Sequence, residues 1–373
     1  MRKILLALIP AFIFLSCGAE DNPTPEPTPT PDPPATEKVF ARGADVSWLS
    51  EMEHDGVKFK KADGSEADLF AILKDCGMDA IRLRVWVKPY SGWSSKNDVV
   101  GLAKRAKAAG MDVMIDFHYS DFFADPSRQV LPADWEADKN DVNKTAAHVK
   151  EHTTEVLQAL KTAGVTPKWV QIGNETRSGM LYPAGRITGS NTAGFSNFAT
   201  LYNAGYDAAK AVFPSVIVMP HLNNALDNNV WWFENLKNAG AKMDAIGLSH
   251  YPQADNSISA AQCNFKAVES VKSLYSKFNI PVFIVEVGVK PAKSDAASVL
   301  KSFMDSVKDL DGCAGVFYWE PEVYGGWVPA VYKDVEALSR LTGTTITKPW
   351  GSYDQGAFTS DGRPHSILDA FKN

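Results

Sequence analysis

Eight short apolar runs alternate with longer helical patterns along most of the chain. The runs lie at residues 39–48, 80–87, 112–119, 169–175, 216–221, 245–251, 282–288 and 315–320. Between them, apolar positions three and four residues apart predict helices, among them those at 68–76, 99–110, 141–164, 198–213, 265–278 and 299–310. Runs with few polar interruptions are typical of parallel strands that are buried on both faces.

Eight such strand and helix units predict an α/β protein with a single (β/α)8 TIM barrel, which we place at residues 39–373. The alternative is an open, doubly wound sheet. That fold requires a glycine-rich phosphate-binding turn after the first strand, and the segment GADVSWLSEME at 43–53 does not contain one.

The N-terminal segment has a different pattern. Residues 1–17 combine a basic start, an apolar run and Cys17, and they resemble a bacterial lipoprotein signal peptide with a lipidated cysteine. An ordinary secretory signal is the alternative. Residues 18–38 are rich in proline and threonine and predict an extended linker. We therefore expect an outer-membrane lipoprotein on the cell surface, held to the membrane by its lipid anchor alone; the acidic pair after Cys17 resembles export signals of Bacteroides-type lipoproteins.

Composition narrows the range of functions. The 373 residues are 45% hydrophobic and 22% charged, which is typical of a globular protein. The net charge of -6 argues against nucleic-acid binding, which needs a basic face. No zinc or haem pattern is present in the sequence, and we expect a monomer that requires no cofactor.

Polar residues close several of the apolar runs, at the end of a barrel where active sites form. They are Asp45, Arg84, His118, Asn174, Glu175, His221, His250, Tyr251, Glu286, Trp319 and Glu320. A carboxylate within an apolar strand is costly to bury, so Glu286 needs a partner or a function. Glu175 closes another run and supplies a second carboxylate. Two carboxylates can divide the work of glycoside hydrolysis, one as proton donor and one as nucleophile.

From Gly43 to Phe358 the chain resembles glycoside hydrolase family 53, the endo-β-1,4-galactanases. The resemblance rests on GADVSWLSEMEHDGVKF, IRLRVWVKP, DFHYSDFFADPSRQ, VQIGNE followed by GMLYP, HYP, IVEVG and FYWEP. It implies that Glu175 is the acid/base and Glu286 the nucleophile of a retaining enzyme that cleaves β-1,4-galactan.

The same resemblance implies supporting roles. Arg84 is expected beside Glu286, where it lowers the pKa of the nucleophile, and Tyr251 is expected to donate a hydrogen bond to Glu286. Asn174 is expected to bind the sugar 2-hydroxyl. Further substrate-binding or supporting roles are expected for Asp45, His118, His250, Trp319, Glu320 and Trp350, with the tryptophans as platforms for pyranose rings.

Two alternatives to a galactanase remain. Another retaining barrel endo-glycanase, such as a β-1,4-glucanase or mannanase, needs the same two glutamates. A surface glycan-binding lipoprotein needs aromatic residues but no paired glutamates. Some relatives hold calcium in an acidic loop after the seventh strand, but here that loop, VKPAKSDAAS, has one acidic residue and does not support a calcium site.

Overall fold

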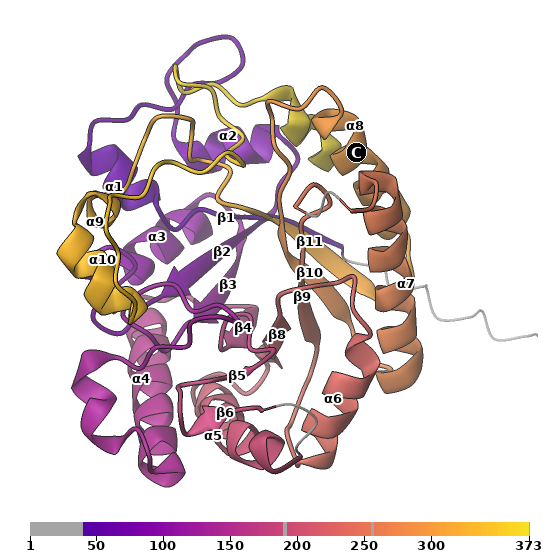
Figure 1. Ribbon diagram of the computed structural model, residues 1–373. Coiled ribbons are helices and arrows are strands. Elements are labelled where there is room, and N and C mark those ends of the chain that lie inside the picture. Colours follow the sequence, from indigo (N-terminus) through magenta and orange to yellow (C-terminus); the bar gives the residue numbers. More distant parts are fainter. Residues whose placement is uncertain (1–39, 189–191, 255–256, 373) are drawn as a thin grey trace, which may run out of the picture. The chain divides into compact units, whose positions relative to one another are not determined.

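Parallel strands form the centre of the computed structural model, which describes residues 40–188, 192–254 and 257–372 (Figure 1). The nine strands of one sheet are β1 (Ala41–Asp45), β2 (Ala80–Val85), β3 (Asp112–Phe117), β4 (Trp169–Ile172), β7 (Ile217–Met219), β8 (His221–Leu222), β9 (Ile246–His250), β10 (Val282–Val287) and β11 (Cys313–Trp319). A short antiparallel pair, β5 (Gly179–Met180) and β6 (Gly185–Arg186), lies outside it. The predicted signal peptide and linker lie outside the described residues.

The sheet closes on itself at Pro220. Its order is β7-β4-β3-β2-β1-β11-β10-β9-β8, and the two outermost strands are consecutive pieces of the predicted run 216–221. Proline has no N–H to donate to a strand ladder, so the run divides there. β7 pairs with β4 on one side, and β8 pairs with β9 on the other. The predicted eight-stranded barrel is confirmed, with its fifth strand in two parts.

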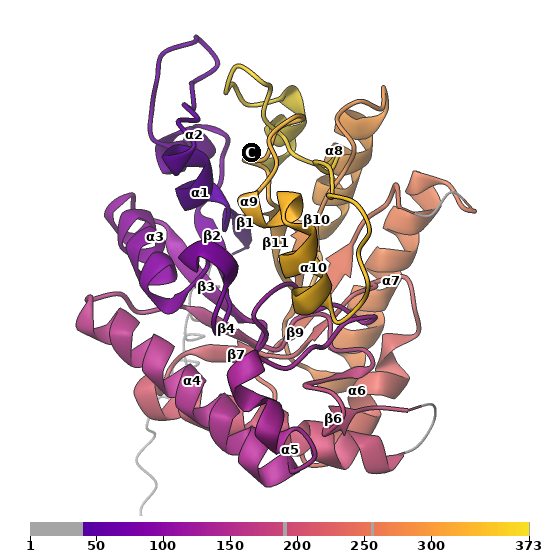
Figure 2. The same cartoon turned by 60° about the vertical axis from the view of Figure 1, so that its left-hand side comes forward.

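Helices surround the strands (Figures 1 and 2). They are α1 (Leu49–His54), α2 (Leu69–Asp75), α3 (Lys96–Ala108), α4 (Val142–Thr162), α5 (Thr192–Val212), α6 (Asn229–Asn238), α7 (Ala260–Phe278), α8 (Ala296–Val307), α9 (Ala330–Lys333) and α10 (Val335–Thr342), with 3-10 turns η1 (Tyr90–Gly92), η2 (Ala133–Asp138) and η3 (Ser366–Phe371). Each of the six predicted helices has a counterpart among them. No described helix is long and apolar enough to cross a membrane.

Local sequence fixes where several helices begin. Ser259 and Gln262 form a capping box at the start of α7, in which each side chain bonds the backbone N–H of the other. Asp68 and Asp141 cap α2 and α4 through their carboxylates. These caps satisfy N–H groups that have no partner within the helix.

Large apolar side chains fill the lower part of the barrel. Trp169 packs edge-on against Phe283 and Phe317, with ring centroids 5.7 and 5.9 Å away. Further along the strands the inward-facing side chains become charged. Arg82 on β2 and Asp116 on β3 are examples, and both are buried. The barrel interior therefore changes from an apolar plug to a polar layer along the strand direction, toward the end where the functional site lies.

Gly43 provides a test of this packing. A Cβ added there would lie 2.2 Å from the Phe317 ring, whereas one added at the exposed helical Gly101 would meet nothing within 4 Å. We expect Gly43→Ala to lower the free energy of unfolding by about 1–3 kcal/mol because it overpacks the barrel. Gly101→Ala should raise it by about 0.5–1 kcal/mol. Urea denaturation measures both, and equal midpoints for the two variants would contradict the packing described here.

Candidate active site

A cavity of about 290 Å³ opens where the strands end. Nine of the predicted site residues line it: Asp45, Arg84, His118, Asn174, Glu175, Tyr251, Glu286, Trp319 and Trp350. Arg82, Phe123, Ala124, Asp125, Arg128 and Tyr332 complete the wall. His250 and Glu320 are not part of the lining. The cavity thus gathers side chains from distant parts of the sequence around the two glutamates.

Glu175 reaches the cavity from an irregular loop after β4. Its backbone has a φ of 48°, a left-handed conformation that is uncommon for residues other than glycine. The loop is bonded across to β8, because Glu175 donates its N–H to His221 Nδ1 at 3.2 Å and Thr176 donates its N–H to the His221 carbonyl at 2.8 Å. Backbone strain of this kind persists only where surrounding bonds enforce it, and it is common in functional sites.

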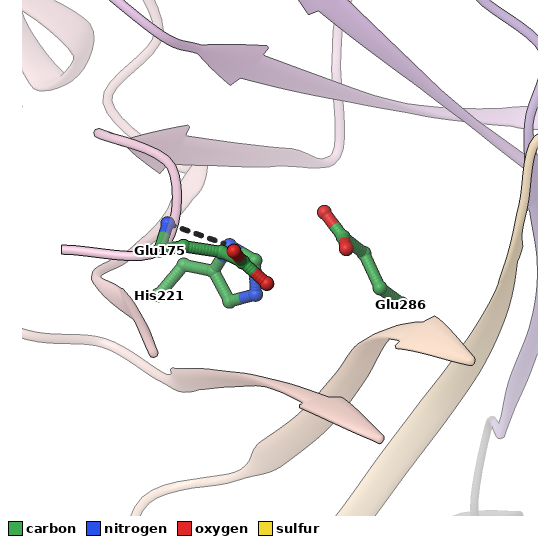
Figure 3. Close-up of side chains that lie close together, drawn as sticks. All are labelled: Glu175, His221 and Glu286. Carbon is green, nitrogen blue, oxygen red and sulfur yellow. Dashed lines mark hydrogen bonds between the residues drawn. The ribbon is translucent and has the colours of Figure 1, made fainter. Parts of the chain in front are cut away.

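Glu286 faces Glu175 from the end of β10 (Figure 3). The guanidinium beside it belongs to Arg82, whose Nη2 lies 3.0 Å from Glu286 Oε1. The prediction that Arg84 fills this position is wrong. Both arginines are on the inward face of β2, two residues apart, and Arg82 lies one step deeper, level with the nucleophile.

Arg82 is a fully buried hub. It forms ion pairs of 2.8 Å with Asp45 and Asp116 in addition to Glu286, and it donates to Asn174 Oδ1 at 2.9 Å. Burial opposes its charge, but the three carboxylates raise its pKa above the ordinary value. Arg82 therefore stays cationic and holds the Glu286 carboxylate in the cavity.

Arg84 points instead toward the last strand. Its guanidinium pairs with Glu320 and lies over the rings of Trp48, Trp86 and Phe123, at 4.2, 4.7 and 4.7 Å from their centroids. Glu320 is fully buried and also accepts the Trp48 indole N–H at 3.0 Å. Glu320, expected as a substrate-binding or supporting residue, therefore does not line the cavity but pairs with Arg84, which does.

The separation of the two glutamates fits double displacement. A carboxylate oxygen of Glu175 and one of Glu286 lie within 4.8 Å of each other. Retaining glycosidases have carboxyl groups about 5–5.5 Å apart, whereas inverting enzymes leave about 6.5–9.5 Å for a water molecule. The cavity has the retaining spacing.

The environments of the two carboxyls differ. Burial raises the pKa of Glu175, and the charge of Glu286 raises it further. Burial also raises the pKa of Glu286, but Arg82 and a 2.7 Å hydrogen bond from the Tyr251 hydroxyl oppose that rise. The proton therefore resides on Glu175 and the negative charge on Glu286, which is the division expected of an acid and a nucleophile. The predicted contact of Tyr251 is confirmed.

Asn174 and His118 lie on the wall beside Glu175. Asn174 donates one amide N–H to the Ala124 carbonyl at 2.8 Å, and its second N–H can serve a sugar hydroxyl. His118 accepts the Ala124 N–H at Nδ1 and lies 2.9 Å from Asp116 through Nε2. Because both ring nitrogens are bonded to protein, His118 can meet substrate only with its carbon edge.

His250 does not face the cavity. It is buried, its Nε2 bonds Asn264 Oδ1 at 2.8 Å, and its ring packs 4.4 Å from that of Phe303. The predicted substrate contact of His250 is wrong, because the side chain points outward between the strand and the helices. Burial lowers its pKa to about 4, so it is neutral at ordinary pH.

Two aromatic platforms line the cavity as predicted. Trp319 packs against Tyr353 with ring centroids 4.9 Å apart. Trp350 packs edge-on against Tyr332 at 5.3 Å, and the Arg128 guanidinium lies over it at the same distance. Their partly exposed indoles are suited to the apolar faces of pyranose rings.

Ser249 was not identified as a site residue from the sequence, and His221 was named at the end of the fifth apolar run without being given a role. Two N–H groups, from Gln171 Nε2 at 3.0 Å and from Glu175, point at His221 Nδ1. Asn174 Oδ1 also lies 3.0 Å from Nδ1, but it already accepts two other N–H groups. Nδ1 is therefore the acceptor, and Nε2 carries the proton toward Ser249 Oγ at 2.8 Å.

The centre of this site also contains the one group of side chains, within the described part of the chain, that resembles a set of metal ligands. Among the described residues, Glu175, His221 and Glu286 are the one acidic and histidine group with ligand atoms close enough to hold a cation. Both nitrogens of His221 are already hydrogen-bonded, so the group does not offer a free imidazole ligand. The loop after β10 is the one in which some relatives are expected to hold calcium. Its single acidic residue, Asp295, accepts a hydrogen bond from Gln253 at 2.8 Å.

The barrel and its facing carboxylates define the class of protein, a retaining glycosidase. Residues 41–296 match the family model described as Glycosyl hydrolase family 53, and the chain belongs to this family. A relative from Aspergillus terreus named "Probable arabinogalactan endo-beta-1,4-galactanase A" is 36% identical over 77% of this chain and 87% of its own length.

Solved structures agree with this assignment. A fungal β-1,4-galactanase structure aligns with a TM-score of 0.73 and 28% identity, covering 90% of this chain and 99% of that one. The family 53 catalytic domain from Ignisphaera aggregans aligns with a TM-score of 0.75 and 26% identity, covering 91% and 97% of the two chains.

The corrected roles of the two arginines can be separated by their lysine variants. Arg82→Lys should lower kcat/KM by about 10- to 100-fold, since an ammonium cannot replace all the bonds and a hydrogen bond to a charged group is worth about 1.5–3 kcal/mol. It should also move the acid limb of the kcat/KM profile to higher pH, because Glu286 loses a stabilising partner. Arg84→Lys should leave the acid limb in place. A shift of the acid limb in Arg84→Lys but not in Arg82→Lys would instead support the original prediction that Arg84 is the partner of Glu286.

Proposed function

We propose that this protein is an endo-acting β-1,4-galactanase that hydrolyses galactan side chains of pectin with net retention. The observation that carries the proposal is the pairing of Glu175 and Glu286 within 4.8 Å in a barrel of family 53. The galactan substrate is supported by relatives named arabinogalactan endo-β-1,4-galactanase.

The reaction proceeds in two displacements. Glu286 attacks the anomeric carbon while Glu175 gives its proton to the leaving glycosidic oxygen, so that the C–O bond breaks as the ester bond to Glu286 forms. Glu175, now ionised, takes a proton from water, whose oxygen attacks the same carbon and releases Glu286. Two inversions at one carbon give overall retention.

The side chains of the site are suited to two substrates, a neutral polysaccharide and water. Carboxyl groups perform both proton transfer and nucleophilic attack, so we propose that no cofactor is needed. Trp319 and Trp350 supply apolar faces for sugar rings, and Asn174 a donor for a hydroxyl. We also propose that the enzyme acts as a monomer, because all the residues named in the mechanism come from one chain.

A comparison of polymers tests the substrate. The purified domain should release galacto-oligosaccharides from β-1,4-galactan and act little on cellulose or mannan, with or without EDTA. Glu175→Gln and Glu286→Gln should each lose most turnover, by at least about 10³-fold, while thermal unfolding stays near the wild-type midpoint. NMR of the first product should show the β-anomer.

The alternatives give different results in the same assay. Cleavage of mannan or cellulose in preference to galactan would indicate another retaining endo-glycanase. Binding of galactan without any hydrolysis would indicate a glycan-binding protein. Full activity in either glutamine variant would refute the assignment of that residue.

We propose further that Cys17 carries a lipid that anchors the enzyme in the outer membrane at the cell surface. The basic start, the apolar run before Cys17 and the proline-rich segment 18–38 support this arrangement. A surface position would bring the barrel to a polymer too large to enter the cell.

Radiolabelled palmitate tests the anchor. The full-length protein expressed in a diderm bacterium should take up label and fractionate with the outer membrane, and Cys17→Ser should lose both properties. Added protease should digest the anchored barrel on intact cells if it faces outward. Label in the Cys17→Ser variant, or none in the wild type, would disprove lipidation at this cysteine.

A further inference from the structure

Ser249 occupies an unusual position between the two catalytic carboxyls. Its Oγ lies 2.9 Å from Glu175 Oε1, 3.3 Å from Glu286 Oε2 and 2.8 Å from His221 Nε2. The side chain stands on β9, next to β10, and is 1% exposed. One small hydroxyl thus touches both groups that exchange charge during the reaction.

The hydrogen of this hydroxyl can serve only one carboxyl at a time. His221 Nε2 carries a proton, so it donates to Ser249 Oγ and leaves the hydroxyl hydrogen for a carboxylate. Burial lowers the pKa of His221 well below its ordinary value, which keeps this tautomer neutral. A hydrogen bond to an ionised carboxylate is about twice as strong as one to a neutral carboxyl, so the hydrogen points to whichever glutamate is charged.

The charge changes place within one catalytic cycle. In the free enzyme Glu286 is ionised and Glu175 is protonated. After the first displacement Glu286 is a neutral ester, and Glu175 has given its proton to the leaving oxygen and is ionised. After the second displacement water has returned the proton to Glu175, and the charge is again on Glu286.

We propose that Ser249 is a positioning residue whose hydroxyl hydrogen follows this charge, turning from Glu286 to Glu175 in the first displacement and back in the second. This inference rests on the proposed roles of the two glutamates. The rotation about the Cβ–Oγ bond transfers no proton. It gives each carboxylate a donor at the stage at which it is ionised, with His221 holding the oxygen in place.

The other hydrogen-bond donors around the pair contact one glutamate only, although the charge of Arg82 also favours the ionised form of Glu175. Arg82 from β2 and the Tyr251 hydroxyl bond Glu286. Asp45 and Asp116, on β1 and β3, disfavour a charge on Glu286, and Asp125 disfavours a charge on Glu175. The hydroxyl of Ser249 is the one side-chain hydrogen-bond donor to the Glu175 carboxylate within the described residues.

The test compares Ser249→Ala with Tyr251→Phe, a matched removal of one hydroxyl donor. The substrate is an aryl β-1,4-galactobioside with a good leaving group, for which breakdown of the glycosyl-enzyme limits turnover. Each variant should move the acid limb of kcat/KM to higher pH, because each takes a donor from ionised Glu286. Only Ser249→Ala should also move the pH dependence of the breakdown step to higher pH, by about one pH unit, because of the two hydroxyls only that of Ser249 donates to ionised Glu175.

Ser249→Thr serves as the conservative variant and should recover the breakdown profile, since it restores a hydroxyl. The proposal is overturned if Ser249→Ala behaves like Tyr251→Phe, or if the alanine and threonine variants have the same profile at equal thermal midpoints. Absence of hydrolysis by the wild-type enzyme on both galactan and the aryl substrate would instead refute the proposed function.

Discussion

The active site depends on one buried cation, the Arg82 guanidinium. A charge this deep in a protein is strongly unfavourable unless carboxylates surround it, and Arg82 has Asp45, Asp116 and Glu286 as partners. The carboxylates also depend on Arg82 for their positions. A guanidinium with five N–H groups in a fixed plane can satisfy several acceptors at once and so fixes their relative positions. The nucleophile is therefore positioned by the same ion pairs that make burial of the arginine tolerable.

This arrangement is compatible with folding because the barrel interior is divided along its axis. The apolar plug around Trp169, Phe283 and Phe317 fills one end of the barrel with buried, packed side chains, and the polar layer lies above it. In that layer the buried charges lose water but gain partners; Arg82 and Asp45 line the cavity, whereas Asp116 lies behind them. The layer of charged residues is therefore supported by closely packed apolar side chains below it.

The sequence predicted the fold well because the barrel is encoded by repetition. Each of the eight strands gave its own apolar signal, and Pro220 divides the fifth of them into β7 and β8. Glu175 and Glu286 were found because a carboxylate inside an apolar run is rare. The choice between Arg82 and Arg84 could not be made in the same way: both share one strand face, and which of them reaches Glu286 depends on the tilt and register of strands far apart in the sequence. His250 was misplaced although the alternation along β9 is regular: Ser249 and Tyr251 point to the glutamates, so His250 between them points outward.

The two glutamates differ in how firmly their charge is supported. Glu286 has a guanidinium and a tyrosine hydroxyl that stay in place throughout, whereas Glu175 has the shared hydroxyl of Ser249. Were both supported equally, both would ionise and no proton would be available for the leaving oxygen. Were Glu175 left without a donor, its ionised form would be less stable once the proton had gone. The asymmetry of the fixed partners thus assigns the roles at rest, and a partner able to turn between the two carboxyls lets those roles reverse within a rigid barrel.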